Sequence, residues 1–447
     1  MSETICALAT ATGGAIGIIR ISGPQTLEIL SRVFSKNLTQ AQPNTIHYGH
    51  IKNRQEIIDE VLVSVFRAPH SYTGEESAEI SCHGSRYILS KVLSLLIANG
   101  CRQAGPGEFT QRAYLNGKMD LSQAEAVADL IASTNQATHQ MAMSQLRGHF
   151  SSKLAQLREQ LLKLTSLLEL ELDFSDHEDL EFADRSELME LTKTINNHII
   201  HLAKSFETGQ ALKQGIPVAI VGKTNVGKST LLNRLLKDDR AIVSDIHGTT
   251  RDTIEDTIDI KGVTFRFIDT AGIRQTQDEV EQIGITRTYA AIEKASIVLW
   301  LIDEEPSTKE INDISQRTGK KKLIVIKNKA DKASNNSYEL LNFPFITISA
   351  KYGTGIEKLE QAIYEAANIP TLTENDIIVT NARHYDALVR AHDSIQRVID
   401  GLEMQLSGDL LSEDLRQALD TLSEITGGQI TPNEVLGNIF KNFCVGK

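Results

Sequence analysis

A glycine-rich stretch, GKTNVGKS at residues 222–229, has the residue types and spacing needed to hold phosphate groups. It follows the apolar run VAIV and precedes TLLNRLL, so we predict a strand, a loop and a helix in that order. The backbone N–H groups of such a loop and the N-terminus of its helix surround phosphate oxygens. Lys228 would add a cation beside the outer phosphates, and the Ser229 hydroxyl would bind Mg²⁺. The stretch therefore predicts a nucleoside triphosphate site.

Three later motifs favour GTP over ATP. Asp269-Thr-Ala-Gly272 ends a predicted strand, where a carboxylate can support the metal and a glycine can approach the terminal phosphate. Asn328-Lys-Ala-Asp331 follows the strand KLIVI, and a carboxylate at Asp331 would accept hydrogen bonds from N1 and N2 of guanine, which adenine does not offer. Ser349-Ala-Lys351 ends FITIS and would support the base. This ordered set resembles GTPases of the translation-factor-related class.

The switch motif Gly248-Thr-Thr-Arg-Asp252 would supply Thr250 as a second Mg²⁺ ligand. The residues predicted to bind the nucleotide are Asn225, Val226, Gly227, Lys228, Ser229, Thr230, Ser244, Asp245, Ile246, His247, Gly248, Thr249, Thr250, Asp269, Thr270, Ala271, Gly272, Asn328, Lys329, Asp331, Ser349, Ala350 and Lys351.

Hydrolysis needs groups that the usual motif does not provide here. Ile273 occupies the position after DTAG where many relatives have a glutamine that orients the attacking water, and no arginine can be assigned as a finger. We predict that Glu281, in QDEVEQIG, positions the water; it can also be read as an exposed acid at a helix start.

Asn225 suggests a source for the missing positive charge. GTPases with asparagine at this loop position often bind K⁺ beside the phosphates, and backbone carbonyls of Ser244, Ile246 and Thr249 would complete the coordination. The alternative is that Asn225 only shapes the loop.

Composition excludes several classes of protein. The net charge of −12 gives no overall basic field, so contact with RNA would need a local patch or a basic partner. No apolar run is long enough to span a membrane, and the N-terminal stretch lacks the basic region of a signal peptide. The four cysteines have neither disulfide-frame nor zinc-ligand spacing, so a cytoplasmic protein is expected.

The organisation of the chain follows from its patterns. Residues 214–373 alternate short β-branched runs with helical stretches, which predicts a mostly parallel sheet wrapped by helices. Residues 119–213 and 374–447 repeat apolar residues at helical spacing, and residues 1–118 contain more glycine and strand-like runs. The predicted fold class is a multidomain α/β protein with an N-terminal α+β domain, an all-α domain in two parts, and an inserted Ras-like P-loop GTPase domain.

Over essentially its whole length the chain resembles the MnmE (TrmE) family of tRNA uridine-modification GTPases. The stretches that carry the resemblance are IGIIRISGP, YTGEESAEISCHG, AGPGEFTQRAYLNGKMDLSQAEAV, LELELDFSD, GKTNVGKST, GTTRD, DTAGIR with DEVEQIGI, NKAD and FCVGK. Three departures, at ATATGGAIG, Thr224 and His247, affect loop stiffness rather than ligating groups.

The resemblance implies a role for each part of the chain. Residues 1–118 would bind a tetrahydrofolate one-carbon donor, either 5-formyl- or 5,10-methylene-tetrahydrofolate, and form a constitutive homodimer. Arg20, Glu79, Lys118 and Lys447 match the folate-contacting positions, and Cys444 matches a proposed catalytic nucleophile. From the residues alone, the three charged positions outside the tail would be read as surface ion-pair members, and Cys444 as a structural cysteine in a docked tail.

The implied function is that of a K⁺-stimulated GTPase. With a flavin-dependent partner, MnmG (GidA), which carries FAD and forms a heterotetramer or larger complex, it would install a (carboxymethyl)aminomethyl group at C5 of uridine 34 in certain tRNAs. Two alternatives remain open at this point. One is a ribosome-assembly GTPase without modification chemistry, and the other is a folate enzyme of one-carbon metabolism with a regulatory GTPase.

Overall fold

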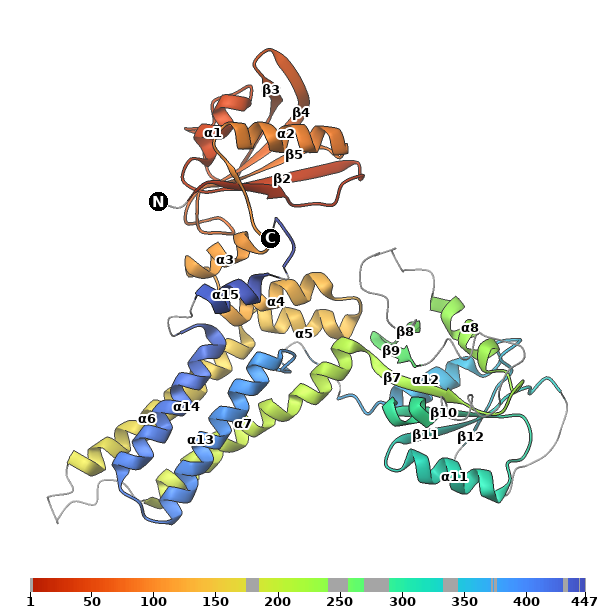
Figure 1. The fold of residues 1–447 in the computed structure, drawn as a ribbon. Helices are drawn as coiled ribbons and strands as arrows, with labels where there is room; N and C mark the ends of the chain where they lie inside the picture. The colour runs from red at the N-terminus through yellow and green to blue at the C-terminus, as the bar shows by residue number, and fades with distance from the viewer. Residues whose placement is uncertain are drawn as a thin grey trace. The chain divides into compact units, whose positions relative to one another are not determined.

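The computed structural model describes residues 3–173, 185–239, 256–268, 289–332, 345–370, 373, 376–428, 433–441 and 443–446 (Figure 1). Contacts divide the chain into two compact units. The first contains residues 1–132, 142–200 and 386–447, and the second contains residues 133–141 and 201–385. Within the described residues, no helix combines the length and the apolar character needed to cross a bilayer.

The first unit begins with a six-stranded sheet in the order β3-β4-β5-β2-β1-β6, in which only the β1–β6 pair is parallel. Side chains that alternate along its strands form a core with α1 and α2, where Ile19, Ile21, Val63, Ile80 and Leu89 are buried. The elements are β1 (Ile5–Leu8), β2 (Ile16–Ser22), α1 (Thr26–Val33), β3 (Thr45–Asn53), β4 (Glu56–Phe66), β5 (Ser77–His83), α2 (Arg86–Ala98) and β6 (Arg102–Gln103).

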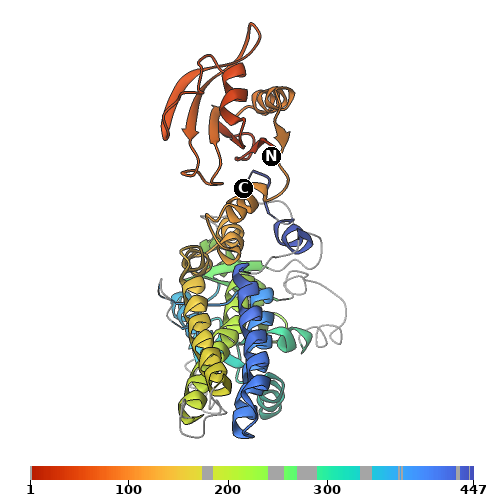
Figure 2. The same cartoon turned by 90° about the vertical axis from the view of Figure 1, so that its left-hand side faces the viewer.

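Helices form the rest of this unit. They include α3 (Glu108–Leu115), α4 (Leu121–Ala132), α6 (His149–Asp173), α14 (Gly408–Thr426) and α15 (Asn433–Phe440). Helices α6 and α14 lie side by side (Figure 2) because each presents a stripe of buried leucines at helical spacing, such as Leu157, Leu161 and Leu164 on α6. Three helices have residues in both units: α5 (Gln136–Leu146), α7 (Arg185–Gln214) and α13 (Ala382–Glu403).

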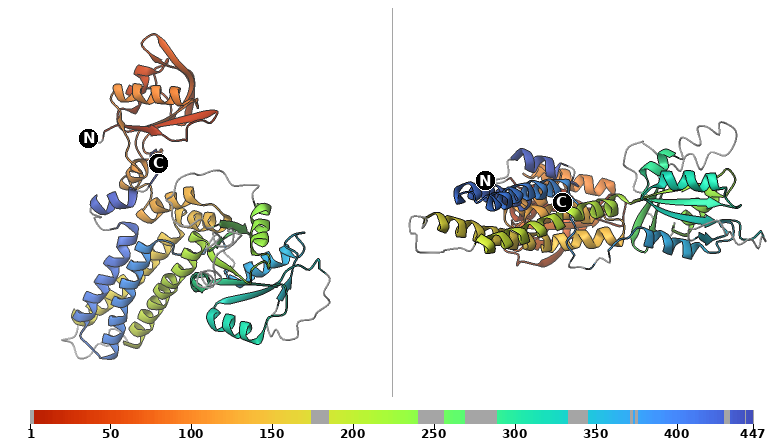
Figure 3. Two further views of the ribbon diagram at one scale, coloured as in Figure 1. Left: turned by 45° about the vertical axis from the view of Figure 1, so that its right-hand side comes forward. Right: turned by 90° about the horizontal axis from the view of Figure 1, so that it is seen from below.

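The second unit has a six-stranded sheet in the order β12-β11-β10-β7-β9-β8, and all its pairs are parallel except β8–β9. Both faces are buried: α8 and α12 pack on one face, and α11 packs on the other (Figure 3). The elements are β7 (Ile216–Val221), α8 (Lys228–Asp239), β8 (Asp256–Ile260), β9 (Val263–Phe267), β10 (Ile297–Ile302), α11 (Thr308–Thr318), β11 (Lys322–Lys327), β12 (Phe345–Thr347) and α12 (Ile356–Ala366).

This sheet confirms the predicted fold class, a mostly parallel sheet within a larger α and α+β chain. The short β-branched runs of residues 214–373 include PVAIVG, SIVLWLID and KLIVIKN, which contain β7, β10 and β11. The central strand β7 pairs with β10 on one side and with β9 on the other. Ligands of such sheets bind beyond the carboxyl ends of the strands, where the strand order changes direction, and the glycine-rich loop follows β7 at that place.

Candidate functional site

The glycine-rich loop connects β7 to α8. At its two glycines the positive φ and the nearby atoms leave no room for a side chain. Gly222 and Gly227 have φ values of 149° and 105°. A Cβ atom on Gly222 would lie 2.4 Å from the Leu301 carbonyl oxygen, and one on Gly227 would lie 2.2 Å from Nδ2 of Asn328. Asn225, between them, also has a positive φ of 60°. The loop is therefore held as an open cradle of backbone groups that a side chain would fill.

Lys228 lies at the start of α8, and its ammonium is turned back onto the loop. Its Nζ donates to the carbonyl oxygens of Gly222 and Lys223, at 2.7 Å each. Burial lowers the pKa of Lys228, which means that the charged form is disfavoured where it lies. Phosphate oxygens in the cradle would favour the charged form, so these residues fit a triphosphate.

Asn328 joins the glycine-rich loop to the two loops predicted to hold the base. Its Nδ2 donates to the Val226 carbonyl oxygen at 2.8 Å, and its Oδ1 accepts from the Ala350 N–H at 3.0 Å. The side chain is buried, with 5% of the residue exposed. Because both ends of the amide are used, this one side chain connects the phosphate loop to the loops predicted to hold the base.

The Asp331 carboxylate is exposed beside this junction. Ser349 donates its hydroxyl to Asp331 Oδ1 at 2.6 Å. This hydrogen bond, with the nearby Lys351 and Lys332, lowers the pKa of Asp331. The carboxylate thus stays ionised and able to accept from guanine. Lys329 is paired elsewhere, since its Nζ donates to Asp303 Oδ2 at 2.6 Å.

Several predicted nucleotide residues lie outside the described part of the chain. They are Ser244, Asp245, Ile246, His247, Gly248, Thr249, Thr250, Asp269, Thr270, Ala271, Gly272 and Glu281. Of the two residues of the predicted Mg²⁺ site, the structure describes Ser229, and of the four residues of the predicted K⁺ site it describes Asn225. Of the predicted GTP residues, the structure brings together those from the glycine-rich loop, 328–331 and 349–351.

A second group of predicted site residues meets on the sheet of the first unit. Arg20 on β2 and Glu79 on β5 are register partners, and Nε and Nη2 of Arg20 donate to Glu79 Oε1 at 2.9 and 2.7 Å. Lys118 is placed differently, with Nζ donating to the Pro69 carbonyl oxygen at 3.0 Å. The Arg20–Glu79 pair combines donors and acceptors in a partly buried place, which fits a polar heterocycle.

The C-terminal tail reaches this pair. Gly107 N–H donates to the Cys444 carbonyl oxygen at 3.3 Å, and Nη1 of Arg20 donates to the Gly446 carbonyl oxygen at 3.2 Å. The residue Cys444 is exposed, and Lys447 lies outside the described residues. Tail and sheet therefore contribute to one location in the first unit.

Two aromatic residues beside Arg20 were not among the site residues predicted from the sequence. The Cζ atom of Arg20 lies 5.4 Å from the ring centroid of Tyr72 and 5.8 Å from that of Phe109. Both rings belong to stretches that carry the family resemblance. Both residues are far from Arg20 along the chain, so no sequence motif indicated that they contact it.

Comparisons with known proteins agree over the whole chain. A family model described as the MnmE helical domain matches residues 121–444, and one described as the GTP-binding protein TrmE N-terminus matches residues 4–118. A tRNA modification GTPase MnmE from Bacteroides thetaiotaomicron is 56% identical, with 100% of this chain and 99% of the relative covered. The chain belongs to the MnmE family.

Further MnmE family relatives show the same full coverage. The tRNA modification GTPases MnmE of Phocaeicola vulgatus and Parabacteroides distasonis are each 54% identical over 100% of this chain and 99% and 100% of their own.

Among solved structures, the G domain of the T. maritima FeoB iron transporter matches 34% of this chain and 98% of its own, at 27% identity and a TM-score of 0.26.

Replacing Gly446 with alanine is expected to release the tail of this MnmE family member from the sheet. Gly446 has a φ of 96°, and a Cβ there would lie 2.1 Å from the Leu8 carbonyl oxygen. We expect the Gly107 amide, which donates to Cys444, to exchange its hydrogen about tenfold faster. Gly437→Ala is the control, since a Cβ at Gly437 meets nothing within 4 Å. Equal Gly107 exchange in both variants would contradict this docking.

Proposed function

We propose that the protein is a K⁺-stimulated GTPase that acts in the modification of uridine 34 of tRNA in the cytoplasm. The observation that supports this most is the junction at Asn328, which joins the loops predicted to hold a guanine nucleotide, in a chain 56% identical to a curated tRNA modification GTPase. Mg²⁺ would be bound by Ser229 and Thr250, and K⁺ by Asn225 with carbonyls of Ser244, Ile246 and Thr249. Glu281 would orient the attacking water.

A homodimer is supported by the uncovered face of the N-terminal sheet. Ile46, Tyr48 and Leu62 are 66%, 55% and 45% exposed, and Tyr48 is the register partner of Leu62. Register also places Ile46, Ser64, Glu79 and Arg20 in one row across four strands, so their side chains share a face. A second copy packed there would bury the apolar strip and enclose the Arg20–Glu79 pair.

The carbon donor would be a tetrahydrofolate derivative held at that pair. Glu79 would accept from the pterin N–H groups, and Arg20, Lys118 and Lys447 would bind its polar and anionic parts. The cofactor would supply the one-carbon unit, and FAD on the MnmG partner would supply the redox chemistry. Cys444, in the tail beside Arg20, is the candidate nucleophile. GTP hydrolysis would drive a rearrangement, so Glu281→Ala is expected to lose modification together with hydrolysis.

Mass spectrometry of wobble nucleosides from a deletion strain tests this function. We expect the modified uridine to disappear on deletion and to return with the wild-type gene. Cys444→Ser is expected to restore less than about a tenth of it, because a hydroxyl is the far weaker nucleophile. Unchanged nucleosides after deletion would overturn the function and favour a folate enzyme of one-carbon metabolism with a regulatory GTPase, whereas full rescue by the serine variant would remove only the nucleophile.

Asn225 connects the activity to the monovalent ion. We expect K⁺ to raise the GTP hydrolysis rate at least about tenfold over Na⁺, because a correctly sized cation would stabilise charge on the phosphates. Asn225→Ala is expected to remove most of that difference. A rate that does not depend on the cation, measured in steady state at constant ionic strength, would limit Asn225 to shaping the loop.

A further inference from the structure

The β8–β9 hairpin grips the start of helix α5, which lies far from it in the sequence. The Ala137 N–H donates to the Gly262 carbonyl oxygen at 3.0 Å. Nδ2 of Asn135 donates to Oγ1 of Thr264 at 2.8 Å, while Oδ1 of Asn135 accepts from the Thr138 N–H at 2.8 Å and caps the helix. Asn135 thus anchors the helix start and the hairpin together. We refer to residues 135–137 with 262–264 as the clasp.

The hairpin turn is shaped for this contact. Lys261 and Gly262 have φ values of 54° and 78°, as a tight two-residue turn requires. A Cβ on Gly262 would lie 2.7 Å from the Cβ of Gln136, so only glycine allows the approach. The turn is also held from α12, because Lys261 Nζ donates to Gln361 Oε1.

Apolar burial fixes the same helix segment to the second unit. Ala137 and Met141 are 5% and 8% exposed and belong to the core that includes Ile258, Val263 and Phe265. Residues 133–141 accordingly cluster with the second unit, whereas α5 continues to Leu146 with residues 142–146 in the first unit. One continuous helix therefore belongs to both units.

The other end of the hairpin is connected to the nucleotide motifs. In the sequence, β8 begins at Asp256, just after the switch motif 248–252, and β9 ends at Phe267, just before 269–272. Phe267 pairs with Val218 of β7, the strand that leads into the glycine-rich loop. Any displacement of these motifs by GTP would act directly on a hairpin whose turn holds α5.

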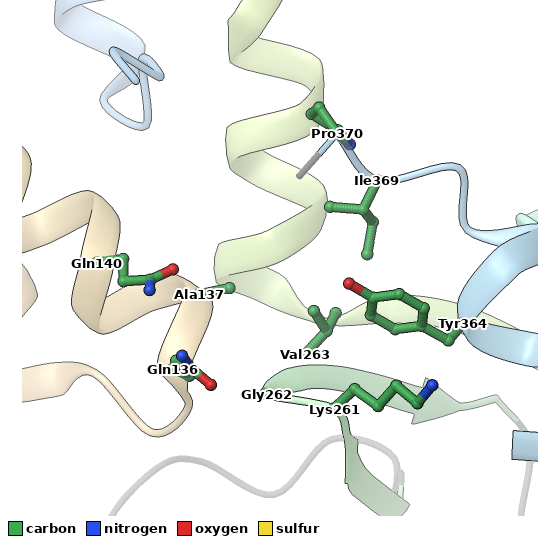
Figure 4. Close-up of a pocket in the computed structure, with 9 residues that line it drawn as sticks. All are labelled: Gln136, Ala137, Gln140, Lys261, Gly262, Val263, Tyr364, Ile369 and Pro370. Atoms are coloured by element: carbon green, nitrogen blue, oxygen red, sulfur yellow. The ribbon is translucent and has the colours of Figure 1, made fainter. Parts of the chain in front are cut away.

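A pocket of about 160 Å³ that is partly open to solvent adjoins the clasp (Figure 4). Gln136 and Gln140 of α5 line it on one side, the turn on a second, and Tyr364, Ile369 and Pro370 on a third. Close packing normally prevents small displacements of a helix. Here the open pocket leaves one side of the turn and the helix start without close packing, so the two can shift together.

We propose that the clasp transmits the nucleotide state of the second unit to helix α5 and, through its continuous backbone, to residues 142–146 of the first unit. This inference rests on the proposed GTPase function. It identifies a coupling element made of Asn135, Gln136 and Ala137 with Gly262 and Thr264. The described residues of the glycine-rich loop, 328–331 and 349–351 make no hydrogen bond to any of these residues.

Hydrogen–deuterium exchange on the full-length protein tests the clasp. Exchange in peptides covering residues 136–146 is compared with GDP and with a non-hydrolysable GTP analogue, both in K⁺. In the wild type we expect the two rates to differ at least about fivefold, the lower range of allosteric coupling. Binding of both nucleotides without a difference in α5 would overturn the clasp alone. No guanine-nucleotide binding at all would overturn the clasp and the proposed function together.

Matched variants separate coupling from folding. Gly262→Ala pushes against Gln136 and is expected to remove the exchange difference and most tRNA modification while GTP hydrolysis stays within about twofold. Gly319→Ala is the control because it has a φ of 56° and meets nothing within 4 Å. Thr264→Val, which removes only the acceptor for Asn135, is expected to halve the difference roughly, whereas Thr257→Val on the exposed side of β8 leaves it unchanged. A full exchange difference in both Gly262→Ala and Thr264→Val would overturn the proposal.

Discussion

Gly227→Ala is expected to weaken GTP binding by at least about 100-fold, since it combines backbone strain with the loss of a buried link. At a φ of 105° an alanine is strained, and its Cβ would lie 2.2 Å from Asn328 Nδ2. Asn328 would have to leave the Val226 carbonyl, and the phosphate loop would lose its connection to Ala350. Titration with a fluorescent GTP analogue measures the effect.

The control for Gly227→Ala is a second glycine substitution in the same unit. Gly319→Ala also places an alanine at a positive φ but has open space for its Cβ. We expect both variants to lose a few degrees of melting temperature, and only Gly227→Ala to lose affinity. A Gly227→Ala protein that binds GTP within about threefold of the wild type would show that the Asn328 junction does not hold the site together.

The fold of the second unit was predictable because its strands are buried on both faces. Runs such as VAIV, IVLWLI and LIVI have no polar alternation, which is typical of a parallel sheet, and glycine and asparagine motifs follow them at the carboxyl ends. Local sequence therefore predicted both the strands and the position of the nucleotide motifs. The resemblance to the family supplied what local patterns do not, including the inserted arrangement.

Tertiary contacts explain what the sequence did not reveal. Residues 133–141 have the apolar spacing of any amphipathic helix, so nothing in Ala137 or Met141 indicates that they enter the core of the second unit rather than the helical bundle. Arg20 and Glu79 are 59 residues apart, and only strand register makes them neighbours. The bridging role of Asn328 likewise depends on two loops far apart in the chain.

These contacts suggest that nucleotide binding and coupling use separate parts of one sheet. The cradle, Asn328 and Asp331 lie at the carboxyl ends of β7 and β11, whereas the clasp lies at the turn of the β8–β9 hairpin. Variants of the two sets should therefore differ in kind. Changes at the cradle should lower the affinity for GTP. Changes at the clasp should leave that affinity unchanged and alter the response of α5 to the nucleotide.

Asp331→Asn is expected to change the base preference of the site from guanine to xanthine. The carboxylate would accept from both N1–H and N2–H of guanine, whereas an amide has one acceptor and would present its N–H₂ to the guanine amino group. Xanthine has a carbonyl at that position, which can accept from the new amide. We expect GTP affinity to fall about 100-fold, because the charge-assisted hydrogen bonds to guanine are lost. We expect xanthosine triphosphate affinity to rise about as much, because the amide and the xanthine carbonyl form a matched donor–acceptor pair. Competition titrations with both nucleotides measure the exchange.

The pH dependence of binding provides an independent check on Asp331. The Ser349 hydroxyl lowers the pKa of Asp331 from its ordinary value of 3.8, so the carboxylate contribution is fully present above that value and is lost only as pH falls through the lowered pKa. GTP affinity should therefore be independent of Asp331 titration between pH 5 and pH 7, a range about one unit or more above the ordinary aspartate pKa. Ser349→Ala removes the hydrogen bond and is expected to move the acid loss of affinity to higher pH. An identical acid limb in the wild type and Ser349→Ala would show that another group controls guanine recognition.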